Sequence, residues 1–309
     1  MLRRLLLAAS DSDAARTLAT SAPGISTVVG KFAAGETAES AVAATRGLVD
    51  AGLRVTLDYL GEDTLDAAQA KLTRDAYVEL LERLDASGLA PDAEVSVKLS
   101  AVGQALSGDG PAIATEHAYA ICESARAAGT MVTLDMEDHT TTDLTLQTLR
   151  ELREDHPSTG AVLQAYLRRT PGDCADLAGP GSRIRLCKGA YDEPESVAFV
   201  ERTEVDRAYV RCLKTLLGGR GYPMIATHDD RIIAIAEALV LRYDRAPDSY
   251  EFQMLYGVRP PEQRRLASVG HCMRVYVPYG TEWYGYLVRR MAERPANLAL
   301  GVRAILGRS

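Results

Sequence analysis

The sequence lacks several patterns that would each assign the protein to a class. Its five cysteines are widely spaced and form no C-x-x-C pair, so we expect neither a cysteine zinc site nor a disulfide framework, and a reducing compartment fits best. No apolar run approaches the roughly 18 residues that a membrane span needs. No G-x-G-x-x-G motif follows a β-rich run, which argues against a Rossmann dinucleotide site. No H-x-H or H-E-x-x-H spacing is present, and we expect no catalytic metal.

The composition indicates an ordinary globular protein. The chain has 309 residues, of which 47% are apolar and 25% are charged, and these proportions are typical of folded domains. Its net charge of -7 argues against a nucleic-acid partner. The opening MLRRLLLAAS is similar to a signal peptide, but its apolar core is too short, and we interpret it as the start of a helix.

Eight short runs rich in β-branched and aromatic residues alternate with stretches of helical character. The runs cover 54–59, 94–99, 131–135, 161–167, 183–188, 223–227, 250–255 and 271–277. The helical stretches, such as 64–87, 111–128 and 193–217, each end before a glycine. This alternation predicts an α/β fold with a parallel sheet, and eight units in about 250 residues is the length of a closed (β/α)8 barrel of the TIM type. A doubly wound sheet is the alternative, although it usually has fewer strands.

Side chains in a barrel strand alternate between the lumen and the surrounding helices. In the second run the aliphatic residues at 95, 97 and 99 should face the helices, which turns Lys98 inward. The same rule turns Asp135 of the third run and Arg185 of the fifth run inward. All three lie toward the C-terminal ends of their strands, where barrels of this class carry their chemistry.

Charged side chains in a narrow lumen are unfavourable unless they are paired. Lys98 and Asp135 belong to neighbouring strands about 4.8 Å apart, so the sequence predicts an ion pair between them. Arg185 has no obvious carboxylate neighbour on its own strand, which suggests that the lumen binds an anionic or electron-rich ligand. A buried structural ion pair that fills the barrel is the alternative.

Two lysines leave a second reaction class open. Lys98 or Lys188 could act as the Schiff-base nucleophile of an aldolase-type barrel lyase. A barrel whose polar mouth only binds a ligand is the third class that the residues allow.

Residues 275–295 read as a strand, a turn at Pro278 and Gly280, and a helix that Pro295 ends. Apolar side chains at 284, 287, 288 and 291 form one stripe of this helix, and those at 286, 289, 290 and 293 form a second stripe on the opposite face. The second stripe, which carries Arg289 and Arg290, is either the solvated face of the helix or a clamp for a carboxylate, because guanidinium groups bind carboxylates in a bidentate manner.

Six sequence blocks resemble the signature blocks of one family and arrive in that family's order. They are VSVKLS (95–100), QAY (164–166), RLCKGAY (185–191), TH (227–228), YEFQMLYG (250–257) and YLVRR (286–290). By these blocks the chain is similar to the proline dehydrogenases of the monofunctional, bacterial type. The resemblance implies a distorted (β/α)8 barrel that binds FAD without a Rossmann domain, with the final helix over the C-terminal mouth. Residues 1–50 would then form an N-terminal helical arm, and 51–309 the barrel that carries the FAD and substrate sites.

The resemblance also implies a substrate site. Its residues would be Lys98, Leu255, Tyr276, Tyr286, Arg289 and Arg290. The lysine and the two arginines would bind the proline carboxylate, and the other three would enclose the pyrrolidine ring. Glu62 matches the family's gate residue and would pair with Arg290.

The catalytic and cofactor residues follow by the same similarity. Asp135 would hold Lys98 and its surroundings in place, and Arg185 would approach the N5 edge of the flavin. The residues that would hold the FAD are Met136, Gln164, Arg185, Lys188, Gly189, Ala190, Thr227 and His228.

The implied activity is the oxidation of L-proline to 1-pyrroline-5-carboxylate by hydride transfer from proline C5 to FAD N5. Electrons would pass on to a membrane quinone, and the product would be released or handed to a pyrroline-5-carboxylate dehydrogenase. We therefore expect a cytoplasmic protein with at most peripheral contact at the inner face of the plasma membrane, because the sequence has no amphipathic anchor.

Overall fold

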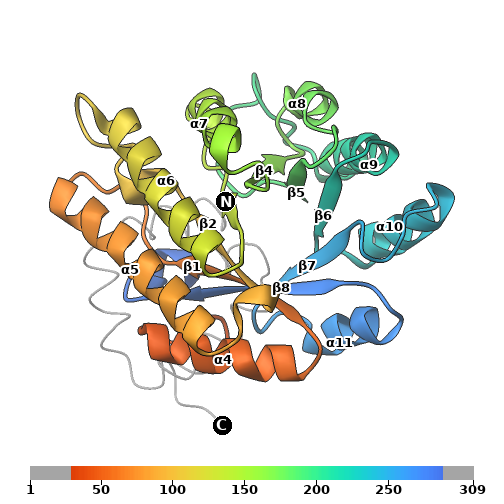
Figure 1. Ribbon diagram of the computed structural model, residues 1–309. Helices are drawn as coiled ribbons and strands as arrows, with labels where there is room; N and C mark the ends of the chain where they lie inside the picture. The colour runs from red at the N-terminus through yellow and green to blue at the C-terminus, as the bar shows by residue number, and fades with distance from the viewer. Residues whose placement is uncertain (1–28, 288–309) are drawn as a thin grey trace, which may run out of the picture.

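The structure of the protein is a computed structural model that describes residues 29–287. Eight parallel strands, each hydrogen-bonded to the next and the last to the first, close into a barrel, and helices surround it (Figure 1). The strands are β1 (Arg54–Tyr59), β2 (Ala93–Val97), β3 (Val132–Leu134), β4 (Gly160–Gln164), β5 (Arg183–Cys187), β6 (Tyr222–Ala226), β7 (Glu251–Leu255) and β8 (Met273–Tyr279). The predicted (β/α)8 barrel is confirmed, and each predicted run contains most of one strand.

In the described part of the chain, α4 (Ala38–Asp50) lies before β1, and one of the remaining named α-helices follows each of the first seven strands. These are α5 (Ala67–Ala86), α6 (Gly110–Ala127), α7 (Thr142–Asp155), α8 (Thr170–Asp176), α9 (Arg202–Gly218), α10 (Asp230–Arg242) and α11 (Pro260–Ser268). Side-chain caps set some of their starts: the carboxylate of Asp66 accepts a hydrogen bond from the amide of Ala68 at 2.7 Å and so begins α5.

The prediction that a helix starts at Glu193 was wrong, because α9 begins at Arg202. Pro194 disfavours a helical backbone at the residue before it. Moreover, Glu193 accepts a hydrogen bond from the backbone amide of His139 at 2.8 Å, which fixes this segment as a loop above the barrel.

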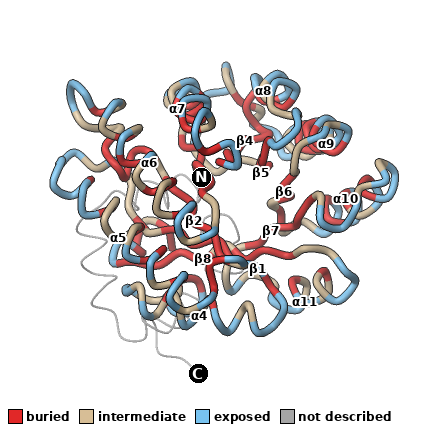
Figure 2. The backbone as a smooth tube through the Cα atoms, in the orientation of Figure 1, coloured by how far each residue is buried: buried red, intermediate tan, exposed pale blue. Residues whose placement is uncertain are grey.

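Burial follows the expected alternation of side chains. Val95, Val97 and Leu186 face the helices and are fully buried in the main hydrophobic core. Figure 2 shows the strands coloured as buried, while the outer sides of the surrounding helices are exposed. The aliphatic layer therefore lies between the sheet and the helices, and the lumen is left for polar side chains.

A second, smaller cluster lies at the C-terminal end of the barrel. It joins the segment before α4 to the residues that follow β8, and it consists of Val29, Phe32, Ala33, Leu60, Trp283, Tyr284, Tyr286 and Leu287. The loop after β7 also meets this segment: Gly257 has φ +71°, and a Cβ there would lie 1.6 Å from the carbonyl oxygen of Lys31. The predicted division into an arm (1–50) and a barrel (51–309) stays a prediction.

The predicted final helix is described only at its start. Residues 283–287 are helical, and Tyr286 and Leu287 are both buried. The rest of this helix, including Arg289 and Arg290, lies outside the described residues, as does the predicted helix at the N-terminus. Among the helices of residues 29–287, none is both long and apolar enough to cross a membrane.

Candidate active site

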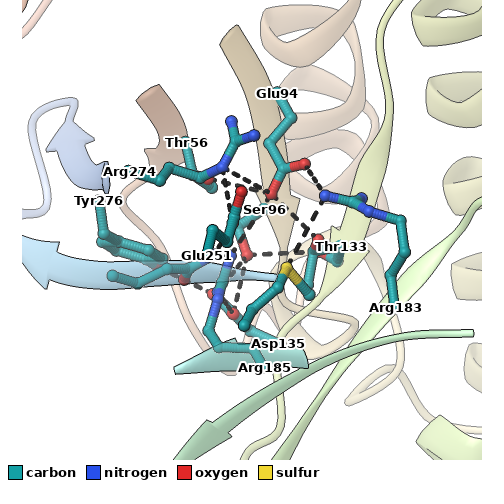
Figure 3. A network of polar contacts seen from close by, with 12 residues as sticks. Thr56, Glu94, Ser96, Thr133, Asp135, Arg183, Arg185, Glu251, Arg274 and Tyr276 are labelled. Carbon is teal, nitrogen blue, oxygen red and sulfur yellow. Dashed lines mark hydrogen bonds and ion pairs between the residues drawn. The ribbon is translucent and has the colours of Figure 1, made fainter. Parts of the chain in front are cut away.

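The lumen holds two rows of charged side chains, each with two acids and two bases. The lower row, nearer the N-terminal ends of the strands, consists of Glu94, Arg183, Glu251 and Arg274. The upper row, nearer the C-terminal ends, consists of Asp58, Lys98, Asp135 and Arg185. Figure 3 shows the lower row together with Asp135 and Arg185 of the upper row, with their polar groups pointing toward one another. Each row is formally neutral, so the strand alternation has produced balanced charge inside the barrel.

Lys98 is paired chiefly with a residue that the sequence analysis did not single out. Its Nζ donates to both carboxylate oxygens of Asp58 at 2.8 Å, whereas the nearest oxygen of Asp135 is 3.9 Å away. The predicted ion pair between Lys98 and Asp135 is therefore present at 3.9 Å, and Asp58 is the closer partner of Lys98. β1 and β2 are hydrogen-bonded neighbours, and Asp58 pairs in register with Ser96, which puts its carboxylate within reach of the Lys98 side chain.

Arg185 has a carboxylate partner on another strand, which corrects the expectation that it is a cation left without one. Its Nη1 donates to Asp135 Oδ1 at 2.6 Å and to Ser96 Oγ at 3.0 Å. The guanidinium carbon lies 5.2 Å from the ring centre of Tyr276, whose hydroxyl donates to Asp135 Oδ2 at 2.7 Å. However, Nε and Nη2 of Arg185 are buried and make no hydrogen bond within residues 29–287. Nη2 lies 3.8 Å from Glu94 Oε1 of the lower row, so Nε is the buried donor of Arg185 that an electron-rich ligand could use.

Glu94 organises the lower row. Its carboxylate accepts hydrogen bonds from Arg183 Nη2 at 2.6 Å and from the hydroxyl groups of Thr56 and Thr133 at 3.0 and 3.3 Å. Burial alone would raise its pKa, but the surrounding guanidinium groups, that of Arg183 first, outweigh burial and hold the pKa at about 2. Glu94 therefore remains ionised.

In the upper row, the effects of burial and of the charge of Lys98 on the carboxylate of Asp58 oppose each other. Burial raises the pKa of Asp58, and the attraction of Lys98 offsets this only in part while the negative charge of Asp135 adds to it. For Lys98, burial is outweighed by the attraction of Asp58 and Asp135, which raises its pKa above the ordinary value. The lysine is therefore held as an ammonium ion.

The loop after β3 adds a third carboxyl group. Burial raises the pKa of Glu137 to about 7, although hydrogen bonds from the hydroxyl and the amide of Ser100 oppose the rise. Gln164, at the end of β4, donates from Nε2 to the backbone carbonyl of Glu137 at 2.7 Å. Met136, between Asp135 and Glu137, is also buried. Two of the predicted cofactor residues, Met136 and Gln164, therefore belong to one packed edge of the mouth.

The remaining predicted cofactor residues follow β5 and β6. Lys188 Nζ lies 2.5 Å from Asp206 and 2.9 Å from Asp229, the residue that caps α10. Gly189, before Ala190, has φ +111°, and a Cβ there would lie 2.2 Å from the ring of Tyr166, so only glycine fits.

Two further hydrogen bonds fix the residues that directly follow β6, Thr227 and His228. Thr227 is buried, and its hydroxyl accepts a hydrogen bond from the amide of Asp229 at 3.2 Å. His228 Nε2 accepts a hydrogen bond from the amide of Leu255 at 2.9 Å, which joins β6 to the end of β7. This bond places one predicted cofactor residue beside one predicted substrate residue.

Glu62 follows β1, and its charge contributes to raising the pKa of Lys98, so it lies near the upper row. Tyr276 is in direct contact with the upper row, and Tyr286 is buried in the cluster above β1 and β8. The predicted clamp of Arg289 and Arg290 and the predicted pair between Glu62 and Arg290 lie outside the described residues.

A cavity of about 500 Å³ opens at the other end of the barrel. It is lined by residues before and at the start of β6 and by residues after α10, among them Tyr222, Tyr243 and Arg245. The guanidinium group of Arg245 already donates to the backbone carbonyls of Gly219, Gly221 and Ser249. We interpret this region as a junction of loops and assign it no ligand.

Comparison with known proteins agrees with this geometry. The family model described as "Proline dehydrogenase" matches residues 41–300. Proline dehydrogenase of Deinococcus radiodurans is 41% identical over 278 residues, which cover 89% of each chain. Proline dehydrogenase 1 of Bacillus subtilis is 38% identical over 308 residues, which cover 99% of each chain. The chain belongs to the proline dehydrogenase family.

Solved structures support the same assignment. Proline utilization A (PutA) from Bdellovibrio bacteriovorus, inactivated by N-propargylglycine, superimposes with a TM-score of 0.79 at 27% identity. The match covers 86% of this chain but only 32% of the PutA chain, so the chain spans about a third of that protein. The predicted family and the predicted activity, oxidation of proline to 1-pyrroline-5-carboxylate, are confirmed by these matches. The family is flavin-dependent.

Asp58, the main partner of Lys98, was not among the residues predicted from the sequence. The signal was available, because Val55 and Leu57 are aliphatic and the alternation rule turns Asp58 inward. Arg274, on the last strand, could have been found in the same way. Tyr77 had no comparable signal: it lies on α5 and reaches into the sheet, where its hydroxyl donates to the carbonyl of Ser96 at 2.7 Å.

Proposed function

We propose that this protein oxidises L-proline to 1-pyrroline-5-carboxylate with FAD held at the C-terminal mouth of the barrel. The observation that carries the proposal is the upper row, in which Arg185 is fixed by Asp135 and Ser96 while its Nε remains buried and without a hydrogen bond in the described part of the chain. Buried donors of this kind are unfavourable unless a ligand uses them.

The residues present fit a flavin. The ring nitrogens and carbonyl oxygens of a flavin are hydrogen-bond acceptors, which suits the guanidinium group of Arg185. Gly189 brings the backbone within contact of Tyr166, and its neighbours Lys188 and Ala190 would hold the cofactor together with Thr227, His228, Gln164 and Met136. When bound, FAD supplies the hydride-accepting chemistry that no side chain provides.

The charge of the upper row explains why proline binding would need the terminal arginines. Proline carries a carboxylate, and the upper row is already neutral because Lys98 is bound to Asp58. Additional cations are therefore required, and Arg289 and Arg290 would supply them beside Lys98, with Glu62 closing over the site. Tyr276, Tyr286 and Leu255 would enclose the apolar part of the ring and keep water away from it.

The Schiff-base alternative is disfavoured by the state of its lysine. A Schiff-base nucleophile must be a neutral amine, yet Asp58 and Asp135 hold Lys98 as an ammonium ion. Lys188 is likewise bound between two carboxylates. Neither lysine has the apolar surroundings that would favour a neutral, nucleophilic amine.

The electron acceptor and partners are part of the proposal. A quinone would take the electrons, which requires at most peripheral contact of a cytoplasmic protein with the inner face of the membrane. The imine product would be released or handed to a pyrroline-5-carboxylate dehydrogenase. We propose no nucleic-acid partner and no metal; within residues 29–287 no group of three or more metal-ligating side chains comes together.

An absorbance titration of the purified protein tests the proposal. A flavin spectrum that is bleached by L-proline under anaerobic conditions is expected, whereas a colourless protein trapped on a lysine by borohydride would point to the lyase. Arg289→Met and Arg290→Met should weaken proline binding strongly and leave the flavin bound. Arg265→Met, at a partly buried ion pair between α10 and α11 outside the barrel lumen, is the matched control and should change neither. Unchanged proline affinity in both terminal variants would refute the clamp.

A further inference from the structure

The lower row is in electrostatic contact with the group that would face the flavin. Glu94 Oε1 lies 3.8 Å from Arg185 Nη2, and Glu94 Oε2 lies 2.6 Å from Arg183 Nη2. On its other side Glu94 Oε1 lies 3.9 Å from Arg274 Nε. A single carboxylate thus touches three guanidinium groups, of which one belongs to the upper row (Figure 3).

The orientation of this carboxylate is fixed. Both Thr56 and Thr133 donate their hydroxyl hydrogens to Oε1, and the Glu94 side chain is 1% exposed. Arg274 is fixed in turn by a 2.8 Å bond from Nε to Glu251 and by a 2.7 Å bond from Nη1 to the carbonyl of Val55. Water cannot screen these charges, and charges in such an environment act over longer distances than at a surface.

The lower row plays no direct part in substrate binding as described above. Its members lie beneath Ser96 and Arg185, nearer the N-terminal ends of the strands, and a bound ligand would meet the upper row first. A charge-balanced row would be unnecessary if the lumen needed only to be filled, because buried ion pairs are often replaceable by apolar side chains without loss of stability.

We propose that the lower row sets the reduction potential of the flavin, with Glu94 and Arg183 acting through Arg185 as positioning residues. This inference rests on the proposed function. Reduction adds two electrons to the flavin ring, and the positive charge of Arg185 would stabilise the reduced ring. The negative charge of Glu94 partly cancels that stabilisation, and Arg183 limits the cancellation by neutralising Glu94.

The two members of this pair should therefore shift the potential in opposite directions. Glu94→Gln removes a negative charge beside Arg185 and should raise the potential of the flavin-loaded protein. Arg183→Met leaves Glu94 to act on Arg185 alone and should lower it. We expect each change to alter the reduction equilibrium about tenfold, which is about 30 mV for a two-electron couple.

The experiment is an anaerobic titration of each flavin-loaded variant against reference dyes of known potential. The double variant Glu94→Gln/Arg183→Met is neutral again and should return close to the wild-type potential. Glu237→Gln is the matched control: it removes a carboxylate that pairs with Arg265 on the outside of the barrel and should leave the potential unchanged. A mere loss of packing would move both single variants in the same direction and the double variant further still.

Each result decides the matter. Shifts of opposite sign that cancel in the double variant support the inference, and shifts of one sign or no shift overturn it. If Glu94→Gln does not fold, Arg183→Met and the neutral double variant still compare a lowered with a restored potential. A wild-type protein that binds no flavin would overturn the proposed function and this inference together. A wild-type protein that proline bleaches, with variants of unaltered potential, would overturn this inference alone.

Discussion

The two rows of the lumen contain the same charges but hold them differently. In the lower row, Glu94 and Glu251 both have pKa values below the ordinary range, since the attraction of nearby guanidinium groups exceeds the effect of burial. In the upper row, burial prevails at Asp58 and raises its pKa. The two carboxylates of the lower row therefore remain ionised at all moderate pH values, whereas the protonation of Asp58 depends on its neighbours.

The difference follows from which residues stand beside each carboxylate. Glu94 lies within 4 Å of three arginines, but Asp58 has one lysine and faces a second carboxylate, Asp135. A carboxylate with fewer cationic neighbours can still change its protonation or its partners when a ligand binds. We interpret the lower row as a rigid support whose charges stay constant, and the upper row as the part that changes during turnover.

Removal of a lower-row cation should have the largest effect. Arg274→Met leaves Glu251 buried without its charged partner, and breaking a buried pair in this way lowers the free energy of unfolding by about 3–5 kcal/mol. Urea denaturation measures the loss. The exposed pair of Arg126 and Glu123 is the control, because Arg126→Met should lower the free energy of unfolding by no more than about 1 kcal/mol. Equal losses in the two variants would remove the distinction between the lower row and the surface.

The corresponding change in the upper row should act on the reaction more than on stability. Arg185→Met removes a fixed positive charge beside the proposed flavin site, and we expect flavin reduction by proline to slow by about 10²-fold. Stopped-flow absorbance under anaerobic conditions gives this rate. Arg185→Lys keeps the charge but not the planar group, so it should recover only part of the rate. Reduction at the wild-type rate in Arg185→Met would exclude the assigned role.

Glu137 should give the mouth of the barrel a pH dependence that the lower row does not have. Its pKa is raised from 4.5 to about 7, so between these values the folded state binds more protons than the unfolded state. The contribution of this group to stability is therefore present below about pH 4.5 and is lost as the pH rises through about 7. Glu137→Gln should gain stability relative to the wild type over this interval, on the order of 3 kcal/mol. If the difference in free energy of unfolding between the two proteins were the same at about pH 4.5 and at about pH 7, this prediction would be contradicted.

The smallest effect is expected at Tyr276. Tyr276→Phe removes the hydroxyl that donates to Asp135 Oδ2 at 2.7 Å, and the loss of one such bond lowers the free energy of unfolding by about 1–2 kcal/mol. The ring remains under Arg185, so the flavin potential should stay close to the wild-type value. A large change in potential would mean that the hydroxyl, rather than the two rows, controls the charge of the site.

Much of this architecture could be predicted from the sequence because it depends on local rules. The alternation of strands and helices predicted the barrel, and the period-two pattern turned Lys98, Asp135 and Arg185 inward. The partners were harder to predict. Lys98 binds Asp58 of β1 and Arg185 binds Asp135 from across the lumen, and which inward side chains meet depends on strand stagger and side-chain length. The start of α9 was missed since tertiary contacts of Glu193 compete with local helix preference.

The alternation of the barrel strands places a strict limit on how this protein can change in length. One residue inserted within β5 would turn every later side chain of that strand to the opposite face. Ile184 or Leu186 would then point into the lumen, and an arginine would point into the aliphatic layer under the helices. Insertions and deletions should therefore be tolerated in the connecting loops and almost nowhere in the strands. A library of single-codon insertions, sorted for folded protein, should show eight intolerant intervals that coincide with β1 to β8.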